Sequence, residues 1–293
     1  MDHQLLVFTT VVEKKNFSRA AEELHMTQPA VSQYIQALEQ QIGTRLLERS
    51  NKFVRLNMAG EIVYHHAKEI LGHYTRMQYL VDDLMNKASG DLFIGASYSF
   101  GEYVLPQMIS NMLEEYPLIK PSITIRNSKR IVNLLIKNEL EVGIVEGEFN
   151  HQNLNIEPFA EDLMYVTVSA NHPFSSQKSI TKEELESETW IIREEGSGTR
   201  EATDKMFRTL QLNPRNKMEF GSTQIIKESV ESGIGISLLS KWAIQRELSS
   251  GTLHVVEFEG LPVRRKFSIV TRTVPFQTKA MELFLKIVRE QYN

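Results

Sequence analysis

Hydroxyl-bearing and glycine residues recur where predicted strands meet predicted helices in the C-terminal two thirds of the chain. The junctions hold Ser97-Tyr98-Ser99, Asn127-Ser128, Glu146-Gly147, Ser197-Gly198-Thr199-Arg200 and Ser222-Thr223. Ligands of open α/β sheets bind outside the carboxyl ends of the strands, and the free N–H groups of a helix N-terminus favour anions. Helix capping explains any one of these hydroxyls alone. Their recurrence at five junctions favours a site for a small, anionic ligand.

Glu146 differs from the rest of this set because a carboxylate repels an anion. It fits an anion site if it is protonated, or if it pairs with a cation such as Arg200. It could instead accept hydrogen bonds from a ligand that is protonated or carries an amine. The sequence leaves these alternatives open.

A second group of chemistry-bearing residues lies near the N-terminus, between two short predicted helices. Phe17–Leu24 fits a helix capped by Ser18, and Thr27–Glu39 fits a second helix capped by Thr27, with Pro29 in its first turn. Apolar residues at helical spacing face inward: Ala20, Ala21, Leu24, Val31, Ile35 and Leu38. The residues left facing outward are of the types that read base edges and bind phosphates: Gln28, Ala30, Ser32, Gln33 and Tyr34.

A basic stretch follows these helices. Four positive residues, Arg45, Arg49, Lys52 and Arg55, are opposed by one negative residue, Glu48, which leaves a local net charge of +3. Such a stretch suits a wing that contacts DNA phosphates. The alternative is a three-helix module with a solvated basic loop.

Composition limits the classes of protein that need to be considered. The chain has 293 residues, which predicts two or three domains, and its net charge of −4 means that nucleic-acid binding requires a local basic patch. The absence of cysteine excludes disulfides, thiol nucleophiles and cysteine-based zinc sites. We expect a cytoplasmic protein that is not bound to a membrane, because the N-terminus lacks a signal-peptide pattern and no apolar run approaches about 18 residues.

The elements that position these residues follow from the apolar patterns. Residues 59–88 carry an unbroken seam with alternate spacings of four and three, formed by Val63, Ala67, Ile70, Tyr74, Met77, Val81 and Leu84. This seam predicts a coiled-coil helix that pairs two chains, and the alternative is packing against the chain's own body. His65, Glu69 and His73 fall on the outer face of this helix, where we expect solvated side chains and no metal site.

From Gly90 onward, short apolar runs alternate with amphipathic ones, which predicts an α/β fold with buried parallel strands. We expect strands at 91–96, 122–126, 141–145, 162–169, 190–193 and 235–239. We expect helices at 102–115, 128–137, 181–186, 198–211, 223–232 and 275–291. About 200 residues of this kind favour two lobes with a cleft between them.

Two other classes of function are weighed against a DNA-binding regulator. An enzyme that uses the α/β cleft is disfavoured because the chain has neither a GxxxxGK[ST] phosphate loop nor a GxSxG elbow. Gly233-Ile-Gly235 also lacks the third glycine of a dinucleotide-binding fingerprint, and we expect no cofactor. A DNA-binding architectural protein without a ligand would have its cleft filled by side chains.

The N-terminal sixty residues resemble the head of the LysR-type transcriptional regulators, most specifically in SRAAEELHMTQPAVSQYIQALE. Three positions depart from the common pattern of that family: Lys15-Asn16, Leu47 and Asn57. Asn57 is a mild departure because asparagine also caps helices. The resemblance implies a winged helix-turn-helix over 1–58 and a dimerisation helix over 59–88. It implies DNA contacts from Ser18, Thr27, Gln28, Pro29, Ala30, Ser32, Gln33, Tyr34, Arg49, Lys52 and Arg55.

The resemblance continues through GASYSFGEYVLP, EVGIVEGE, REEGSGTR and GSTQIIKESVESGIGISLLS. These segments look like the effector domain of that family, a fold similar to periplasmic binding proteins, over 89–293. Lobe I would span about 90–160 and 267–293, and lobe II about 161–266. The implied effector residues are Ser97, Tyr98, Ser99, Ser128, Glu146, Ser197, Gly198, Thr199, Arg200 and Thr223.

The pairing of GASYSFGEY with EEGSGTR resembles the branch that regulates sulfur assimilation or carbon fixation. The partners that the family resemblance implies are double-stranded promoter DNA, a small effector and further copies of the chain, in a homodimer or homotetramer. RNA polymerase is a further candidate partner.

Overall fold

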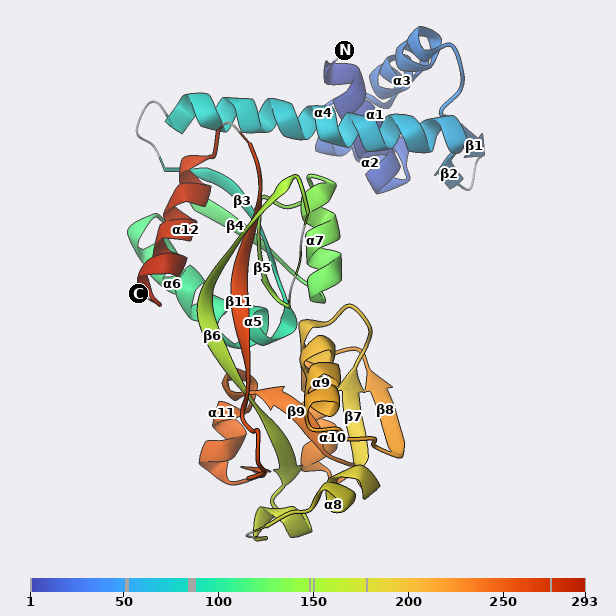
Figure 1. Cartoon of the computed structure of the whole chain (residues 1–293). Helices are drawn as coiled ribbons and strands as arrows, with labels where there is room; N and C mark the ends of the chain where they lie inside the picture. The colour runs from blue at the N-terminus through green and yellow to red at the C-terminus, as the bar shows by residue number, and fades with distance from the viewer. Residues whose placement is uncertain are drawn as a thin grey trace. The chain divides into compact units, whose positions relative to one another are not determined.

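The computed structural model describes residues 2–50, 53–83, 88–147, 149, 151–177, 179–274 and 276–292. The chain divides into two compact units, residues 1–86 and 87–293, and each unit has hydrophobic core clusters of its own. Figure 1 shows both units and labels most of their helices and strands.

The N-terminal unit begins with three helices and a two-stranded wing: α1 (Asp2–Lys14), α2 (Phe17–Glu23), α3 (Gln28–Ile42), β1 (Leu47–Ser50) and β2 (Phe53–Leu56). The inward residues that the sequence predicts all belong to one core, in which Ala20, Val31 and Ile35 are fully buried. The two wing strands pair antiparallel, with Leu47 opposite Leu56. The head is therefore helical apart from this hairpin.

Helices α2 and α3 each begin at a side-chain cap. The side chain of Asn16 caps α2, because its Oδ1 accepts hydrogen bonds from the N–H groups of Ser18 (2.8 Å) and Arg19 (3.0 Å). The prediction that Ser18 caps this helix is wrong, since Ser18 lies in its first turn. Thr27 caps α3 as predicted, and its Oγ1 accepts a hydrogen bond from the N–H of Ala30 at 3.4 Å.

Helix α4 (Met58–Asp83) follows the wing and starts against the head. Asn57 caps it, since its Oδ1 accepts a hydrogen bond from the N–H of Gly60 at 2.8 Å. Gly60 lets α4 lie close to the backbone of Leu46, because a Cβ at this position would be 2.1 Å from the Leu46 carbonyl oxygen. Farther along, Lys68 pairs with Glu13 of α1 at 2.8 Å, which ties α4 to the head.

The predicted seam of α4 divides into two parts. Ala67 is buried and Val63 is partly buried, and both belong to the core of the head. The alternative of packing against the chain's own body thus holds for this first part. The second part lies open, with exposed fractions of 47–58% for Ile70, Tyr74, Met77 and Val81. Leu84 lies outside the described residues.

A mixed sheet runs through the C-terminal unit in the order β10-β6-β11-β5-β3-β4, with β9 beside β6. Its strands are β3 (Gly90–Ala96), β4 (Ile119–Ile125), β5 (Val142–Glu146), β6 (Leu154–Ser169), β9 (Ser237–Ser240), β10 (Leu253–Val255) and β11 (Val263–Arg272). The long strands β6 and β11 pair antiparallel and pass through both lobes (Figure 1). Strands β7 (Thr189–Arg193) and β8 (Asn216–Phe220) form a separate parallel pair.

Helices cover these strands in each lobe (Figure 1). In lobe I, α5 (Tyr98–Tyr103), α6 (Leu105–Glu115) and α12 (Lys279–Glu290) pack on one face of the sheet, and α7 (Ser128–Ile136) packs on the other. Lobe II contains η1 (Pro173–Ser175), α8 (Lys182–Ser187), α9 (Gly198–Thr209), α10 (Thr223–Glu231) and α11 (Lys241–Ser250). Its core surrounds the fully buried Trp190, whose indole N–H donates a hydrogen bond to the Leu185 carbonyl at 2.8 Å.

The structure differs from the predicted elements at several places. The single helix expected near Glu102–Glu115 is two helices that meet at Val104, because Pro106 in the first turn of α6 cannot continue a preceding helix. The last helix begins at Lys279 and not at Pro275, and Thr278 caps it. The sequence pattern does not predict β8, β10, β11 or α11. It also does not predict the antiparallel pairing of β6 with β11.

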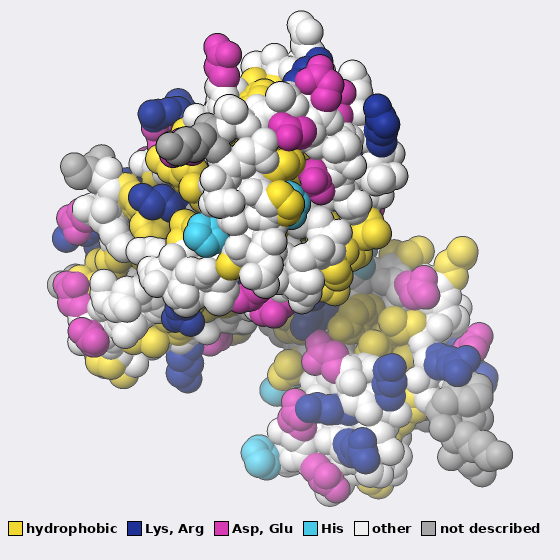
Figure 2. Space-filling view, turned by 90° about the horizontal axis from the view of Figure 1, so that it is seen from below, with side chains coloured by type: hydrophobic (Ala, Val, Ile, Leu, Met, Phe, Trp, Pro, Cys, Tyr) yellow, Lys and Arg dark blue, Asp and Glu magenta, His cyan; other side chains and the backbone are white. Residues whose placement is uncertain are grey.

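Basic and acidic side chains are interspersed on the face shown in Figure 2, in keeping with the small net charge of −4. Within the described ranges, no helix is both long enough and apolar enough to cross a membrane. No group of three or more histidine, aspartate or glutamate side chains gathers as metal ligands among those same residues. On α4, the Nε2 atom of His65 lies 3.8 Å from Glu69, and both residues face outward as predicted.

Candidate nucleic-acid interface and interlobe site

Helix α3 presents the predicted DNA-contacting residues on the side away from its buried face. Gln28, Pro29 and Gln33 are exposed, and Ala30, Ser32 and Tyr34 are half-buried, while Val31, Ile35 and Leu38 fill the core. The Gln28 amide donates a hydrogen bond to the Ser32 hydroxyl at 3.0 Å. Thr27 and Ser18 are exposed in the turns that open α3 and α2. The surface at the start of α3 therefore holds amide and hydroxyl groups of the kinds that read bases and phosphates.

The wing is attached to α3 by a partly buried contact that the sequence analysis missed. The Glu39 carboxylate accepts hydrogen bonds from the N–H groups of Leu46 (2.9 Å) and Leu47 (3.2 Å), at the start of β1. Arg55 is exposed on β2 and stands opposite Glu48. The side chain of Arg49 and the whole of Lys52 lie outside the described residues. Glu39 thus fixes the position of Arg55 relative to α3.

Arg265 lies at the centre of the second site, between the two lobes of the C-terminal unit. Its guanidinium donates hydrogen bonds to Asp162 Oδ2 (2.7 Å), Thr199 Oγ1 (3.0 Å) and Ser99 Oγ (2.9 Å). Its Nη2 atom also lies 3.5 Å from Oε1 of Glu146. Because Ser99 belongs to α5 in lobe I and Thr199 to α9 in lobe II, Arg265 joins the two lobes.

Glu146 ends β5 beside this guanidinium. Its Oε2 accepts a hydrogen bond from the Ser128 hydroxyl at 3.1 Å. Its Oε1 and the Oγ atom of Ser97 are both buried, and neither has a hydrogen-bond partner among the described residues. Ser97 follows β3, the strand next to β5, and its N–H donates to the Ile144 carbonyl at 2.8 Å. The two unsatisfied oxygens therefore lie at the same edge of the sheet.

Asp162 is the second acidic partner of Arg265. Burial raises the pKa of Asp162, and the charge of Glu146 also raises it. The charge of Arg265 and the hydrogen bond from the Ser240 hydroxyl, at 2.8 Å, act in the opposite direction. One guanidinium thus faces two carboxyl groups.

A second buried arginine, Arg193, ends β7 in lobe II. It donates two hydrogen bonds to the Glu194 carboxylate (2.7 and 2.9 Å) and one to the Thr223 hydroxyl (3.2 Å). Its guanidinium carbon lies 4.5 Å from the centre of the Tyr98 ring of lobe I. Burial acts to raise the pKa of Glu194, but the hydrogen bonds from Arg193 and Asn127 outweigh it and hold this pKa below its usual value.

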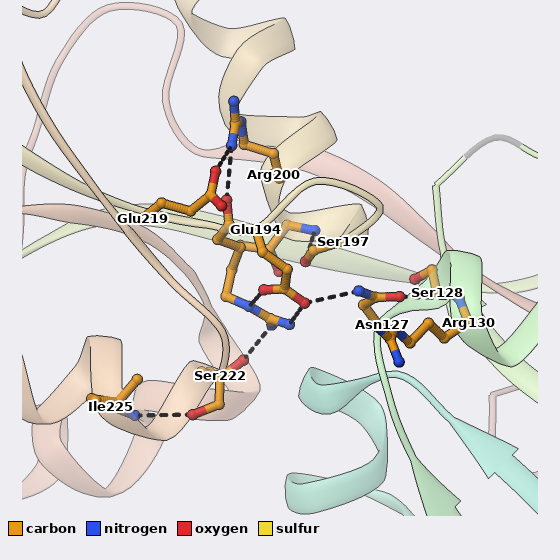
Figure 3. A network of polar contacts seen from close by, with 12 residues as sticks. Asn127, Ser128, Arg130, Glu194, Ser197, Arg200, Glu219, Ser222 and Ile225 are labelled. Carbon is orange, nitrogen blue, oxygen red and sulfur yellow. Dashed lines mark hydrogen bonds and ion pairs between the residues drawn. The ribbon is translucent and has the colours of Figure 1, made fainter.

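Arg200 does not pair with Glu146. Its guanidinium contacts Asp204 (3.0 Å) and Glu219 (2.8 Å), and it is directed at Glu219 in Figure 3. The same figure shows Glu194 facing Asn127 of lobe I, whose amide donates a hydrogen bond to it at 3.0 Å. The cation beside Glu146 is Arg265, which the sequence analysis missed.

A third cluster joins α5 to α10 at the edge of the interlobe site. Lys227 is buried, pairs with Glu247 at 2.8 Å, and lies 5.0 Å from the centre of the Tyr103 ring. The Tyr103 hydroxyl donates a hydrogen bond to Gln224 at 3.0 Å. Burial raises the pKa of Glu102, although the charges of Arg193 and Lys227 act to lower it.

Gly198 sets how closely α9 approaches β5. A Cβ at this position would lie 2.5 Å from the backbone oxygen of Glu146. We expect Gly198→Ala to lower the free energy of unfolding of the C-terminal unit by about 1–3 kcal/mol, because the two lobes must move apart. Denaturation followed by tryptophan fluorescence measures this, since both tryptophans, Trp190 and Trp242, belong to that unit.

The control for this variant is Gly221→Ala in the same unit, where a Cβ would meet nothing within 4 Å. It should leave the midpoint of unfolding nearly unchanged. Equal effects of the two substitutions would contradict the role assigned to Gly198.

Comparisons with known proteins are consistent with this arrangement. Residues 86–293 match the LysR substrate binding domain, and residues 3–61 match the bacterial regulatory helix-turn-helix protein, lysR family. The chain belongs to the LysR family. It is therefore a DNA-binding transcriptional regulator with an effector-binding domain.

Individual LysR-family proteins are similar to this chain over nearly its whole length. The HTH-type transcriptional regulator CysL of Bacillus subtilis is 33% identical over 289 residues, which cover 99% of this chain and 97% of CysL. A probable RuBisCO transcriptional regulator of Cyanophora paradoxa is 31% identical, with coverage of 99% and 91%. These relatives are regulators and not enzymes, and they match the sulfur and carbon-fixation branch that the sequence indicates.

A solved structure resembles the C-terminal unit. The regulatory domain of Synechocystis CcmR in complex with 2-PG superposes with a TM-score of 0.65 at 25% identity. The match covers 70% of this chain and 98% of that domain. The two-lobed fold expected from the sequence is thereby confirmed for this LysR-family chain.

Proposed function

We propose that this LysR-family regulator reads promoter DNA with the start of α3 and binds a small polar effector between its two lobes. The observation that carries the effector site is the gathering of buried side chains from separate strand–helix junctions around Arg265 and Arg193. The residues assigned to it are Ser97, Tyr98, Ser99, Ser128, Glu146, Ser197, Gly198, Thr199 and Thr223. Arg200 is less suited, because its guanidinium contacts Asp204 and Glu219. An anionic effector stays a prediction.

The assigned division of the chain is a head over 1–58, a linker helix over 59–88 and an effector domain over 89–293. The half-exposed apolar residues of α4 support pairing of two chains, since a partner helix would remove them from water. Two such dimers would form a tetramer. A cytoplasmic location and RNA polymerase as a further partner belong to the same proposal, because promoter DNA is where transcription begins.

Effector binding would act by shifting the closure of the two lobes, which changes the packing of dimers and the spacing of the DNA-binding heads. The order of head, linker helix and sensing domain supports this mechanism. A DNA footprint and bend that stay identical with saturating effector would contradict it.

The DNA-reading role is tested by comparing Gln28→Ala with Arg55→Ala. We expect Gln28→Ala to reduce the ratio of specific to non-specific DNA affinity about tenfold or more, because an amide contact to a base edge is lost. We expect Arg55→Ala to weaken binding to every DNA similarly and to reduce the salt slope by about 0.9.

The measurement is a binding titration at several salt concentrations. The specific probe is DNA selected by the protein from random sequence, and the non-specific probe is a scrambled duplex of the same length. The reverse pattern, with discrimination lost in Arg55→Ala and kept in Gln28→Ala, would show that Gln28 is not the residue that reads bases in the groove.

A further inference from the structure

The interlobe site holds more acidic than basic side chains. Arg193 is paired with Glu194 and Lys227 with Glu247, so these two cations are already compensated. Arg265 faces both Asp162 and Glu146, and Glu102 adds a half-buried carboxylate near Arg193 and Lys227. Three basic side chains therefore face five acidic ones, an excess of two carboxyl groups. A purely anionic ligand would add to this excess.

Two buried oxygen atoms in the same site lack a hydrogen-bond partner. These atoms are Oγ of Ser97 and Oε1 of Glu146, in residues that are 1% and 2% exposed. Leaving a buried polar atom without a hydrogen-bond partner destabilises a protein, and native structures contain few such atoms. Oε1 of an ionised Glu146 accepts hydrogen bonds only, whereas the Ser97 hydroxyl can accept or donate one. The Arg265 guanidinium is 3.5 Å from Oε1 and is already engaged with Ser99. Oε1 of Glu146 therefore lacks a donor, and a ligand that supplies donors can satisfy both oxygens.

We propose that the effector of this site carries a protonated amine, which donates hydrogen bonds to Glu146 Oε1 and Ser97 Oγ. An ammonium group has three donors and one positive charge, so it satisfies both oxygens and offsets part of the acidic excess. The proposal rests on the proposed effector-binding function of the interlobe site. It makes Glu146 the residue that distinguishes amines from molecules of the same shape without an amine.

The probes are the twenty common amino acids, each paired with the acid that lacks only its amino group, such as aspartate with succinate. Binding to the full-length chain is measured by thermal unfolding followed by the fluorescence of Trp190 and Trp242, over a range of probe concentrations. We expect at least one amino acid to give a saturable stabilisation. Its deaminated partner should bind about tenfold more weakly or worse, since a hydrogen bond to a charged group is lost.

Two variants and one control assign the effect to the two oxygens. Glu146→Gln should weaken binding of that amino acid about tenfold or more, and its effect on the deaminated partner should be small or favourable. Ser97→Ala keeps the charge of Glu146 and should weaken binding of the amino acid by a smaller factor. It provides the test if the Glu146→Gln protein does not fold. The control Glu139→Gln removes the same charge at an exposed position of lobe I and should leave binding unchanged.

The outcomes separate the amine from the effector site itself. The proposed amine is contradicted if an amino acid and its deaminated partner bind equally well, or if neither variant changes the binding. Either result leaves the proposed effector site itself intact. The proposed amine is also contradicted if no amino acid gives a saturable stabilisation. If DNA binding is in addition unaffected by a whole small-molecule cell extract, the proposed effector site is overturned as well.

Discussion

Replacement of Arg265 by alanine should lower the free energy of unfolding of the effector-binding unit by about 3–5 kcal/mol, the range typical of a buried ion pair that loses one partner. The substitution leaves Asp162 and Glu146 buried without their cation. It also removes the hydrogen bonds to the Ser99 and Thr199 hydroxyls, which hold the two lobes together. We expect a larger effect than from any exposed ion pair of the unit.

Denaturant unfolding followed by the fluorescence of Trp190 and Trp242 measures this change in the full chain, because both tryptophans lie in the effector-binding unit. The neighbouring residue supplies a matched control. Arg264 pairs with Glu161 at 2.9 Å, but its side chain is 68% exposed, so Arg264→Ala should cost less than about 1 kcal/mol. Similar effects of the two substitutions would mean that Arg265 does not stabilise the closed lobes.

The defect of the Arg265→Ala variant should also depend on pH. Burial raises the pKa of Asp162, and Arg265 opposes that rise. Removal of Arg265 should therefore raise the pKa of Asp162 in the folded protein further above its value in the unfolded chain. A carboxyl group with a raised folded pKa destabilises the protein when it is ionised, and the penalty disappears as the pH falls and the group is protonated. The stability difference from wild type should therefore shrink on going from pH 8 to pH 5.

The hydroxyl-bearing part of the interlobe site follows from the sequence because it depends on local pattern. A serine or threonine between an apolar strand and an amphipathic helix lies at the carboxyl edge of a sheet in any α/β fold. Ser99, Ser128 and Thr199 are found there, with the bonds to Arg265 and Glu146 described above. Which hydroxyl meets which partner depends on how the lobes close, and no local pattern states that.

The buried cations are harder to predict than the hydroxyls. Arg265 stands in the run Val263-Arg264-Arg265-Lys266, which is typical of a solvated loop, and only the alternation of β11 buries it. The sequence gives a weak indication of a role for Arg193, since this charged residue ends an apolar strand. Strand β8 is largely exposed and polar, so it lacks the apolar pattern from which the other strands are predicted.

The two halves of the α4 seam show a second limit of sequence patterns. Regular apolar spacing indicates that a helix face is covered, but it does not indicate by what. Val63 and Ala67 pack on the core of the same head, whereas Ile70, Tyr74, Met77 and Val81 remain half-exposed in a single chain. Only the second group is available to a partner helix.

Met77→Asp should convert the protein from a dimer or larger assembly to a monomer. Met77 is 52% exposed and lies between Tyr74 and Val81 on the open part of the seam. A charge there would have to be buried against the apolar face of a partner helix, which is strongly unfavourable without a cation. Because two linked heads bind two half-sites with high effective concentration, affinity for the specific DNA should fall about hundredfold or more.

Sedimentation velocity measures the assembly, and a binding titration with the selected DNA measures the affinity. The control is Thr75→Asp, which adds the same charge two residues away, at an exposed position outside the seam. It should change neither measurement. A Met77→Asp protein that still dimerises would show that the exposed part of the seam is not the contact between chains. Loss of the dimer with unchanged DNA affinity would instead show that one head alone accounts for binding, so that pairing serves only the response to effector.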